Sequence, residues 1–318
     1  MDDPRPASIH SLIRRDIGPA EPVKARPAHI HAKMSPDDAF RITLSDCLAQ
    51  MTANAATVRV GRSVEGLHQL RVGFRRLEVA LGAFAKEFHK DWLEELRGRA
   101  KVLSARLGQA RDLDVFIDER LDRAVETQDR ELLTPLRVRA VAARDAAWKQ
   151  AQICVAGEDF ALFLDDVAGL AASRLPLAGD ASLPKVARRI LSRQWKRARK
   201  RGHAARNRDE GDLHRLRIAL KKLRYTAEFF APLYKQKKVK AYLAKVRKLQ
   251  DHLGEINDIA HVRTTLSNLM RDGGPRKNAE LNFAAGMVTG WYRAHRPRLA
   301  KQALKRWQRF RKINPFWA

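Results

Sequence analysis

Two cationic stretches, residues 67–77 and 213–223, carry the side chains that proteins use to hold phosphate groups. Each stretch starts with a Leu-His pair and has Arg or Lys three, seven and eight residues after the His. Arg offers a flat fork of donors that matches phosphate oxygens, Lys a mobile point charge, and His a donor that becomes charged below about pH 6.5. The chemistry that these residues predict is the binding of phosphate-like anions.

The two stretches belong to a duplication with a fixed offset of 146 residues. A second motif, Leu-Gly followed by Asp four residues after the Gly, occurs at Asp112 and again at Asp258 with the same offset. Two motifs that keep one offset indicate a repeated structural unit. We therefore expect the cations of both copies to form one surface.

Helical periodicity places these cations beside a buried face. In the second copy the apolar row is Leu213, Leu216, Leu220 and Leu223, and the cationic row is His214, Arg217, Lys221 and Arg224. In the first copy the apolar row is Leu67, Leu70, Phe74 and Leu77, and the neighbouring row is His68, Arg71, Arg75 and Glu78. A cationic row about 100° from an apolar row lies at the edge of the core, where charges are screened less than in open solvent. Glu78 in place of a cation predicts a weaker contribution from the first copy.

A further cationic row lies on the predicted helix 184–206, and its members are Arg189, Arg193, Arg197 and Lys200. Like charges at this spacing cost about 0.2–0.5 kcal/mol per pair in an isolated helix, and a bound polyanion would offset that repulsion. Neighbouring predicted helices add Lys101, Arg106, Lys245 and Lys248 as candidate contacts. The alternative is that these residues form ordinary solvent-exposed helix faces and bind no ligand.

The repeated acids and histidines have structural interpretations too. Asp112 and Asp258 follow a possible helix end, so we expect them to cap a helix or to orient an Arg of the cationic row, and not to act in catalysis. Neither His68 nor His214 has a carboxylate, Cys or second His three or four residues further on. We therefore expect no metal ion and no other cofactor.

The net charge of +27 is confined to the second half of the 318-residue chain. Residues 183–318 hold 36 Lys and Arg against 9 Asp and Glu, whereas residues 1–182 hold 27 of each. Such an excess favours a polyanionic partner, namely nucleic acid, an anionic membrane or a phosphate polymer. With two cysteines in no disulfide or metal-ligand spacing and no run of 18 apolar residues, the chain is expected to be soluble and to occupy a reducing compartment.

The periodic pattern predicts an all-α fold. Expected helices lie near 37–60, 63–89, 91–108, 111–126, 129–156, 158–175, 184–206, 210–231, 236–253, 255–272, 276–294 and 297–312. Residues 1–36, rich in Pro, are expected to form a flexible leader, with Ser35 as N-cap and Pro36 as the first residue of the first helix. A break between Pro176 and Pro184 divides the rest into halves 37–178 and 179–318, which predicts two bundles about a pseudo-twofold axis.

The paired motifs resemble those of the conserved histidine α-helical domain family (CHAD). That family has His-x-x-Arg-x-x-x-Arg/Lys-Arg/Lys-Leu and Leu-Gly-x-x-x-Asp in each of two halves, and the ending with Trp307, Phe310 and Trp317 is similar as well. The resemblance implies two four-helix bundles that enclose a basic central cleft for inorganic polyphosphate, and association with polyphosphate granules in the cytoplasm of bacteria. It implies as anion contacts His68, Arg71, Arg75, Arg76, His214, Arg217, Lys221, Lys222 and Arg224. Many relatives are fused to a CYTH triphosphatase domain with a Glu-x-Glu-x-Lys motif, which this sequence lacks, so a stand-alone domain is expected.

Three functions remain open on the sequence. The first is non-catalytic binding of inorganic polyphosphate. The second is recognition of the phosphate backbone of nucleic acid, although the cationic rows lack the interleaved aromatic residues of single-strand binders. The third is an enzyme acting on phosphoanhydrides, which generally needs carboxylates that hold a divalent metal or a glycine-rich phosphate loop. We find neither pattern, and therefore expect a binding protein and not an enzyme.

Overall fold

A computed structural model describes residues 21–88, 92–125, 127–175, 181–271 and 279–318, and all regular secondary structure in these residues is helical. The α-helices are α2 (Pro36–Val60), α3 (Val64–Phe88), α4 (Trp92–Arg106), α5 (Gly108–Val115), α6 (Thr134–Ala156), α7 (Glu158–Ala172), α8 (Leu183–Ala204), α9 (Glu210–Phe229), α10 (Gln236–Arg271) and α11 (Ala279–Phe310). A π-helical turn covers Phe116–Arg120, and short 3-10 turns cover Asp122–Ala124, Thr127–Leu133, Ala205–Asn207 and Ala231–Leu233. The predicted all-α class is confirmed.

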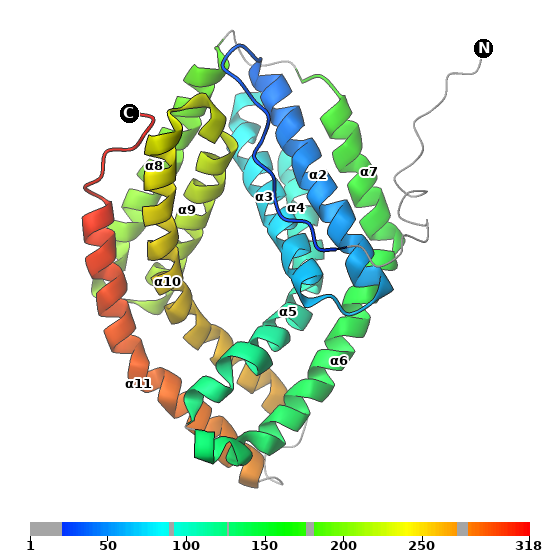
Figure 1. Cartoon of the computed structure of the whole chain (residues 1–318), viewed down its shortest axis with the longest axis vertical. Coiled ribbons are helices and arrows are strands. Elements are labelled where there is room, and N and C mark those ends of the chain that lie inside the picture. The colour runs from blue at the N-terminus through cyan, green and yellow to red at the C-terminus, as the bar shows by residue number, and fades with distance from the viewer. Residues whose placement is uncertain (1–20, 89–91, 126, 176–180, 272–278) are drawn as a thin grey trace, which may run out of the picture.

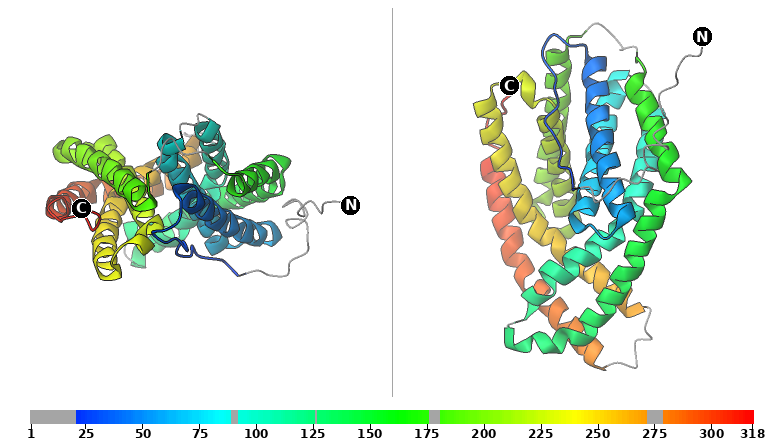
Figure 2. Two further views of the ribbon diagram at one scale, coloured as in Figure 1. Left: turned by 90° about the horizontal axis from the view of Figure 1, so that it is seen from above. Right: turned by 45° about the vertical axis from the view of Figure 1, so that its right-hand side comes forward.

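The helices pack in two groups that stand side by side (Figures 1 and 2). The first helix group consists of α2, α3, α4 and α7, and the second consists of α8, α9, α10 and α11. Helix α3 of the first group contacts α9 of the second, so the two helices that carry the repeated motif meet. At the lower end of Figure 1, α5 and α6 pack against α10 and α11.

The apolar rows predicted for both copies are buried. Each of their eight side chains is at most 1% exposed. They belong to a single core that extends through both helix groups, and Phe84 of α3 contacts Phe230 at the end of α9 with ring centroids 5.7 Å apart. Burial of this continuous core fixes how the two cationic rows face each other.

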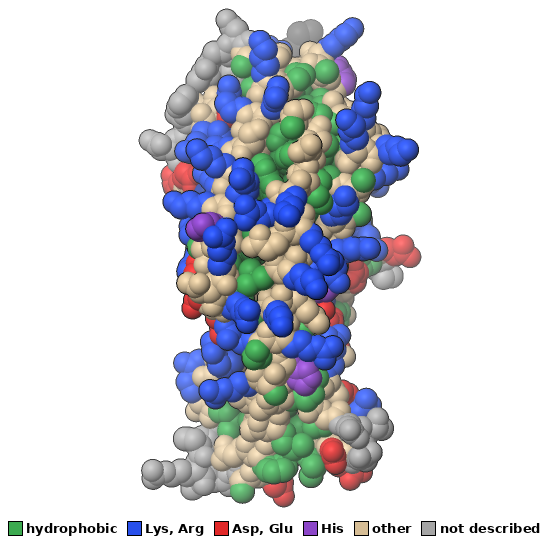
Figure 3. Space-filling view, turned by 90° about the vertical axis from the view of Figure 1, so that its left-hand side faces the viewer, with side chains coloured by type: hydrophobic (Ala, Val, Ile, Leu, Met, Phe, Trp, Pro, Cys, Tyr) green, Lys and Arg blue, Asp and Glu red, His purple; other side chains and the backbone are tan. Residues whose placement is uncertain are grey.

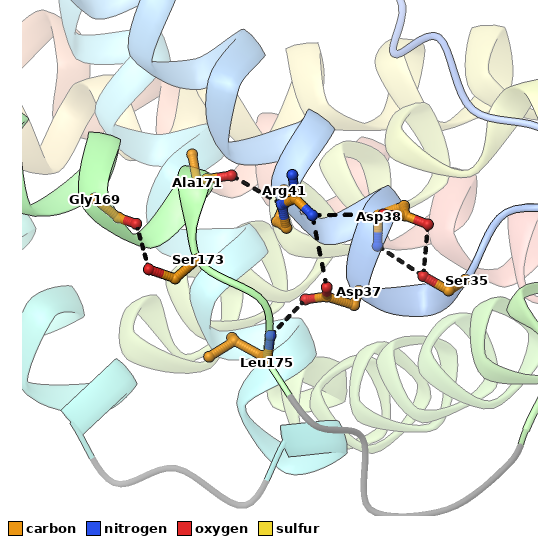
Figure 4. Close-up of polar contacts among 8 residues, drawn as sticks. All are labelled: Ser35, Asp37, Asp38, Arg41, Gly169, Ala171, Ser173 and Leu175. Carbon is orange, nitrogen blue, oxygen red and sulfur yellow. Dashed lines mark hydrogen bonds and ion pairs between the residues drawn. The ribbon is translucent and has the colours of Figure 1, made fainter. Parts of the chain in front are cut away.

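Helix α2 starts as the sequence predicts. Ser35 is the N-cap, its Oγ accepts a hydrogen bond from the Asp38 backbone N–H at 3.0 Å, and Pro36 opens the first turn. Figure 4 shows that the same end is tied to the end of α7, where Asp37 accepts from the Leu175 N–H at 3.1 Å and Arg41 donates to the Ala171 carbonyl at 3.0 Å. These contacts close the first helix group.

Part of the predicted leader is packed and not loose. Residues 21–35 have no helix, yet Ala28 and Ile30 are buried in the core. Asn54 of α2 binds the Val23 backbone on both sides, accepting from its N–H at 3.0 Å and donating to its carbonyl at 2.8 Å. The prediction of a flexible segment is thus wrong for residues 21–35, and residues 1–20 lie outside the described residues, as does most of the predicted break, 176–180.

Three predicted helix boundaries are also wrong. Helix α10 runs through Gly254, and α11 runs through Pro297, where the sequence predicted separate helices. Both helices bury residues on each side of these positions, such as Leu249 and Ile256 in α10, so packing outweighs the low helix propensity of Gly and Pro. The helix expected over 111–126 ends as α5 at Val115 and continues as a π-helical turn. Among the described residues, no helix combines the length and the apolar character that crossing a membrane requires.

Candidate anion-binding site

Five cationic side chains from both copies gather where α3 meets α9. We call this set the central cluster: Arg71 and Arg75 of α3, with Arg217, Lys221 and Arg224 of α9. Burial, followed by the charges of Arg217 and Arg75, lowers the pKa of Lys221 to about 6. Burial is also the main cause that lowers the pKa of Arg71 and of Arg217. Cations from the two halves are therefore close enough to repel one another.

Some donor atoms of the central cluster have no hydrogen-bond partner among the described residues. The Nε atoms of Arg75, Arg217 and Arg224 are buried and lack a hydrogen-bond partner in the part of the chain that the structure describes. A buried, unsatisfied cationic donor is costly, and an anion that accepts from it removes the cost. Arg224 also donates through Nη1 to Glu228 Oε1 at 3.2 Å. In the described residues no carboxylate forms an ion pair with Arg75, Arg217 or Lys221, so the cluster keeps an excess of positive charge that a bound anion would offset.

Asp112 lies beside an Arg of the first cationic row, as one of the two sequence interpretations proposed, whereas Asp258 pairs with an Arg outside both rows. Asp112 Oδ1 lies 3.7 Å from Arg71 Nη2, while Arg71 Nη1 donates to the Ser104 carbonyl at 3.4 Å. The guanidinium crosses Gly108 so closely that a Cβ there would lie 2.5 Å from Arg71 Nη1. In the second copy Asp258 accepts from Arg120 Nη2 at 2.6 Å, and its charge also acts on Arg217.

Two pockets lie near the central cluster, one of them lined in part by Arg71 and both of them lined by Glu78. The α8 pocket, about 520 Å³, opens between α3, α4, α8 and α9, and its ionisable lining residues are Glu78, Lys86, Glu94, Arg97, Arg197, Lys200, Arg201, Arg215 and Lys222. The α10 pocket, about 790 Å³, is lined by residues of α3, α4, α5, α6 and α10, and its ionisable lining residues are Arg71, Glu78, Lys101, Asp112, His261 and Arg271. Because Glu78 lines both, the two pockets meet at α3.

The α8 pocket concentrates positive charge from both helix groups. Burial lowers the pKa of Lys222, and the charges of Arg97 and Arg197 lower it further. Glu78 lies among these cations, yet burial raises its pKa more than Lys101 and Arg97 lower it. We call the central cluster and the two pockets together the basic region. The carboxylate in the first cationic row therefore lies inside the basic region, where its negative charge would repel an anion.

Arg76 points away from the central cluster. It is 4% exposed, its Nη1 donates to Gln50 Oε1 at 2.9 Å, and its guanidinium lies over the Phe229 ring at 5.6 Å. These contacts link α2, α3 and α9 inside the core. We therefore correct its predicted place among the anion contacts to a structural one.

A buried carboxylate far away in the sequence pairs with Arg189 and Arg193. Glu87 of α3, whose side chain is 3% exposed, accepts from Arg193 Nη1 at 3.1 Å and from both Nε and Nη2 of Arg189. Arg193 Nη2 also donates to the Ala83 carbonyl at 2.8 Å. The two arginines thus attach α8 to α3, whereas Arg197 and Lys200 of the same predicted row line the α8 pocket.

The remaining predicted contacts are distributed unevenly. Arg106 pairs with Asp159 of α7 at 3.2 Å, and Lys245 and Lys248 are exposed on α10 and line neither pocket. His214 Nδ1 lies 2.7 Å from Asn257 Oδ1. Burial, followed by the charge of Arg111, lowers the pKa of His68 and keeps it neutral near pH 7.

Several residues of the basic region were missed by the sequence analysis. Arg97 and Lys86 of the first half, with Arg201 and Arg215 of the second, line the α8 pocket, and His261 lines the α10 pocket. Arg215 lies within the repeated stretch 213–223 but outside its cationic row, and the other four lie outside both repeated motifs. Only the spacing of Arg97 four residues before Lys101 pointed to a shared helix face. In the described residues, no group of three or more His, Cys, Asp and Glu is placed to hold a metal ion.

Comparisons with known proteins agree with this architecture. The family model of the CHAD domain matches residues 42–267. The crystal structure of the CHAD domain from the plant Ricinus communis superposes with a TM-score of 0.81 and 26% identity, covering 92% of this chain and 98% of that chain. PptA from Streptomyces chartreusis superposes with a TM-score of 0.69 and 18% identity, covering 86% of this chain and 100% of that chain, which is a likeness of fold. A search of curated proteins found no match.

Proposed function

The chain belongs to the CHAD family, which is linked to polyphosphate binding, and we propose that it binds inorganic polyphosphate in the basic region between its two helix groups. The observation that carries the proposal is the convergence of cationic donors where α3 meets α9, where the charges of Arg71 and Arg75 from one copy and Arg217 and Arg224 from the other all act on the buried Lys221. These donors come from both copies of the motif. A ligand with many closely spaced phosphates could satisfy them together.

The pockets on either side of α3 give a polymer room to extend. A chain held by the central cluster would continue past Lys222 and Arg197 in the α8 pocket and past Lys101 in the α10 pocket. Binding would be driven by charge pairing and by release of counterions, and would therefore weaken steeply as the salt concentration rises. His68, the first residue of the first cationic row, would contribute a further donor.

The proposed role is binding without cleavage or synthesis of the polymer. The repeated acids that might have assisted a reaction, Asp112 and Asp258, are paired with Arg71 and Arg120. A carboxylate in such a pair stabilises and orients a cation. We extend the proposal to association with polyphosphate granules in the cytoplasm, since a polymer-binding domain that leaves its ligand intact would remain attached to them.

Equilibrium binding of fluorescently labelled long-chain polyphosphate across a salt series tests the proposal. We expect tight binding at low salt, a linear fall of log affinity with log salt concentration, and no release of orthophosphate with Mg²⁺ or Mn²⁺ present. Short duplex and single-stranded DNA should displace the polymer poorly at equal phosphate concentration. Efficient displacement by DNA would favour nucleic-acid binding, and orthophosphate release in proportion to protein would show an enzyme.

A further inference from the structure

A third pocket lies on the outside of the second helix group, between α8 and α11. This outer pocket has a volume of about 480 Å³, within the range of small-molecule sites. Arg199 and His203 line it, whereas Arg197 and Arg201 line the α8 pocket. Because successive helical residues turn by about 100°, these two pairs project from opposite sides of α8. The outer pocket is therefore separate from the basic region proposed for polyphosphate.

The outer pocket combines two indole rings with cationic side chains. Its lining includes Trp195, Lys196, Arg199, His203, Trp307 and Arg311, and no carboxylate. Among the described residues, neither Lys196 nor Arg199 has a carboxylate within ion-pair distance, and Arg311 Nη1 donates to the amide of Gln308 at 3.2 Å. Figure 3 shows that this outer face carries many Lys and Arg side chains and few acidic ones.

The two indole rings differ in how far they are exposed to a ligand. Trp307 is 1% exposed and packs directly on Gly202, and its Nε1 is buried with no hydrogen-bond partner in the described residues. Trp195 is only partly buried, and it meets Phe310 edge to face at 5.6 Å. Trp195 is thus the aromatic surface available to a ligand, and Lys196 and Arg199 lie one residue and one turn further along α8.

We propose that the outer pocket binds a nucleotide unit, with the base against Trp195 and the phosphates on Lys196 and Arg199. A bare phosphate chain would use the cations and leave the indole without a role. An aromatic ligand without phosphates would leave Lys196 and Arg199 without a partner. A base with attached phosphates uses both, in the combination of stacking and positive charge found in proteins that bind single-stranded nucleic acid. The site stands independently of the polyphosphate proposal.

Calorimetric titration of the full chain with ATP, tripolyphosphate and adenosine tests this inference. The central quantity is the ATP affinity divided by the tripolyphosphate affinity, because attraction of phosphate to the basic region contributes to both. We expect ATP to bind at least fivefold more tightly than tripolyphosphate, and adenosine to bind weakly. A ratio near one in the unmodified protein would overturn the proposal.

Variants locate the effect. Lys196→Glu with Arg199→Glu should bring the affinity ratio close to one, whereas Lys237→Glu with Lys238→Glu, an equal charge change at exposed positions of α10, should leave it unchanged. Arg197→Glu with Lys200→Glu, in the α8 pocket, should weaken long-chain polyphosphate and preserve the ratio. Trp195→Leu should lower the ratio by at least threefold. An unchanged ratio in the Lys196/Arg199 variant would overturn the site whatever Trp195→Leu does.

One further arm separates the two sources of a nucleotide unit. A single-stranded oligonucleotide of about ten residues is titrated against the ATP complex. Displacement of ATP at equal nucleotide concentration would identify single-stranded nucleic acid as a source, and failure to displace it would assign the pocket to free nucleotides. Loss of polyphosphate binding in the Arg197/Lys200 variant would not affect either result, so the two proposals fail separately.

Discussion

Lys221 lies at the point where the cations of the two copies are most crowded. Burial and four neighbouring arginines lower the pKa of its ammonium group to about 6, so the free protein carries it mostly neutral at pH 7.5. A bound polyanion favours the charged form and raises this pKa. We therefore expect Lys221 to take up close to one proton when polyphosphate binds at pH 7.5. The affinity for polyphosphate should increase as the pH falls toward 6, because Lys221 is then already charged in the free protein.

Calorimetry in buffers of different ionisation enthalpy measures that uptake. Lys221→Arg provides the matched variant, because arginine keeps its charge at every pH used and leaves little proton to be taken up. Uptake that is as large in Lys221→Arg as in the unmodified protein would show that another group, such as His68, titrates instead.

Glu78 is the carboxylate inside the basic region, and its removal should improve binding. Burial raises its pKa, but above that pKa the negative charge repels phosphate. At pH 8 we expect Glu78→Gln to bind polyphosphate about three- to tenfold more tightly, equivalent to roughly 1 kcal/mol of relieved repulsion. The gain should disappear as the pH falls and the native carboxyl becomes protonated. Glu158→Gln, an exposed position on α7, is the control, and an equal gain there would mean that overall charge alone matters.

Residue roles could be predicted from the sequence where spacing decides them. The heptad-like rows placed Arg71, Arg75, Arg217 and Lys221 at the edge of the core, and the structure brings them together. Spacing could not show that the Arg76 side chain points into the core toward Gln50. Arg76 follows Arg75 directly, and the rotation of about 100° between them decides which of the two faces the basic region. Nor could it reveal Glu87 as the partner of Arg189 and Arg193, since that pair forms between residues about a hundred positions apart.

Among the elements, two glycines inside helices differ in the space around them, and only the packing of neighbouring residues shows the difference. Gly202 in α8 lies against the Trp307 indole, where a Cβ would come within 2.0 Å of the ring. Gly254 in α10 has nothing within 4 Å of the same position. From the sequence, Gly254 was predicted to end a helix. In the structure, buried residues on both sides of Gly254 pack in the core and α10 continues through it.

Alanine substitutions at these glycines should shift the free energy of unfolding in opposite directions. Gly202→Ala should lower it by about 1–3 kcal/mol, because the rigid indole must move. Gly254→Ala should raise it by about 0.5–1 kcal/mol, because alanine restricts the unfolded chain without a clash. Denaturant unfolding monitored by circular dichroism gives both values, and a stabilised Gly202→Ala would show that Trp307 is not held against α8.

Over the whole molecule, the helical periodicity predicted an all-α protein and the duplication predicted that cations from both copies meet. Helix α3 does contact α9, so the two helices that carry these cations lie together. The net charge did not predict where the proposed anion site lies. All of the excess belongs to residues 183–318, yet Arg71, Arg75, Arg97 and Lys101 of the first half take part in the basic region. Charge counts report on the surface as a whole, whereas the fold decides which cations converge.

The central claim is that both halves hold one polyphosphate chain together, and three double variants that each remove two positive charges test it. They are Arg75→Gln with Lys101→Gln in the first half, Arg197→Gln with Lys222→Gln in the second, and Lys237→Gln with Lys238→Gln on the exposed start of α10. Polyphosphate Kd at fixed salt is the measurement, with helical content as the folding control. We predict losses of at least tenfold for the first two and less than twofold for the third. Equal losses in all three would contradict a shared site and leave only nonspecific attraction.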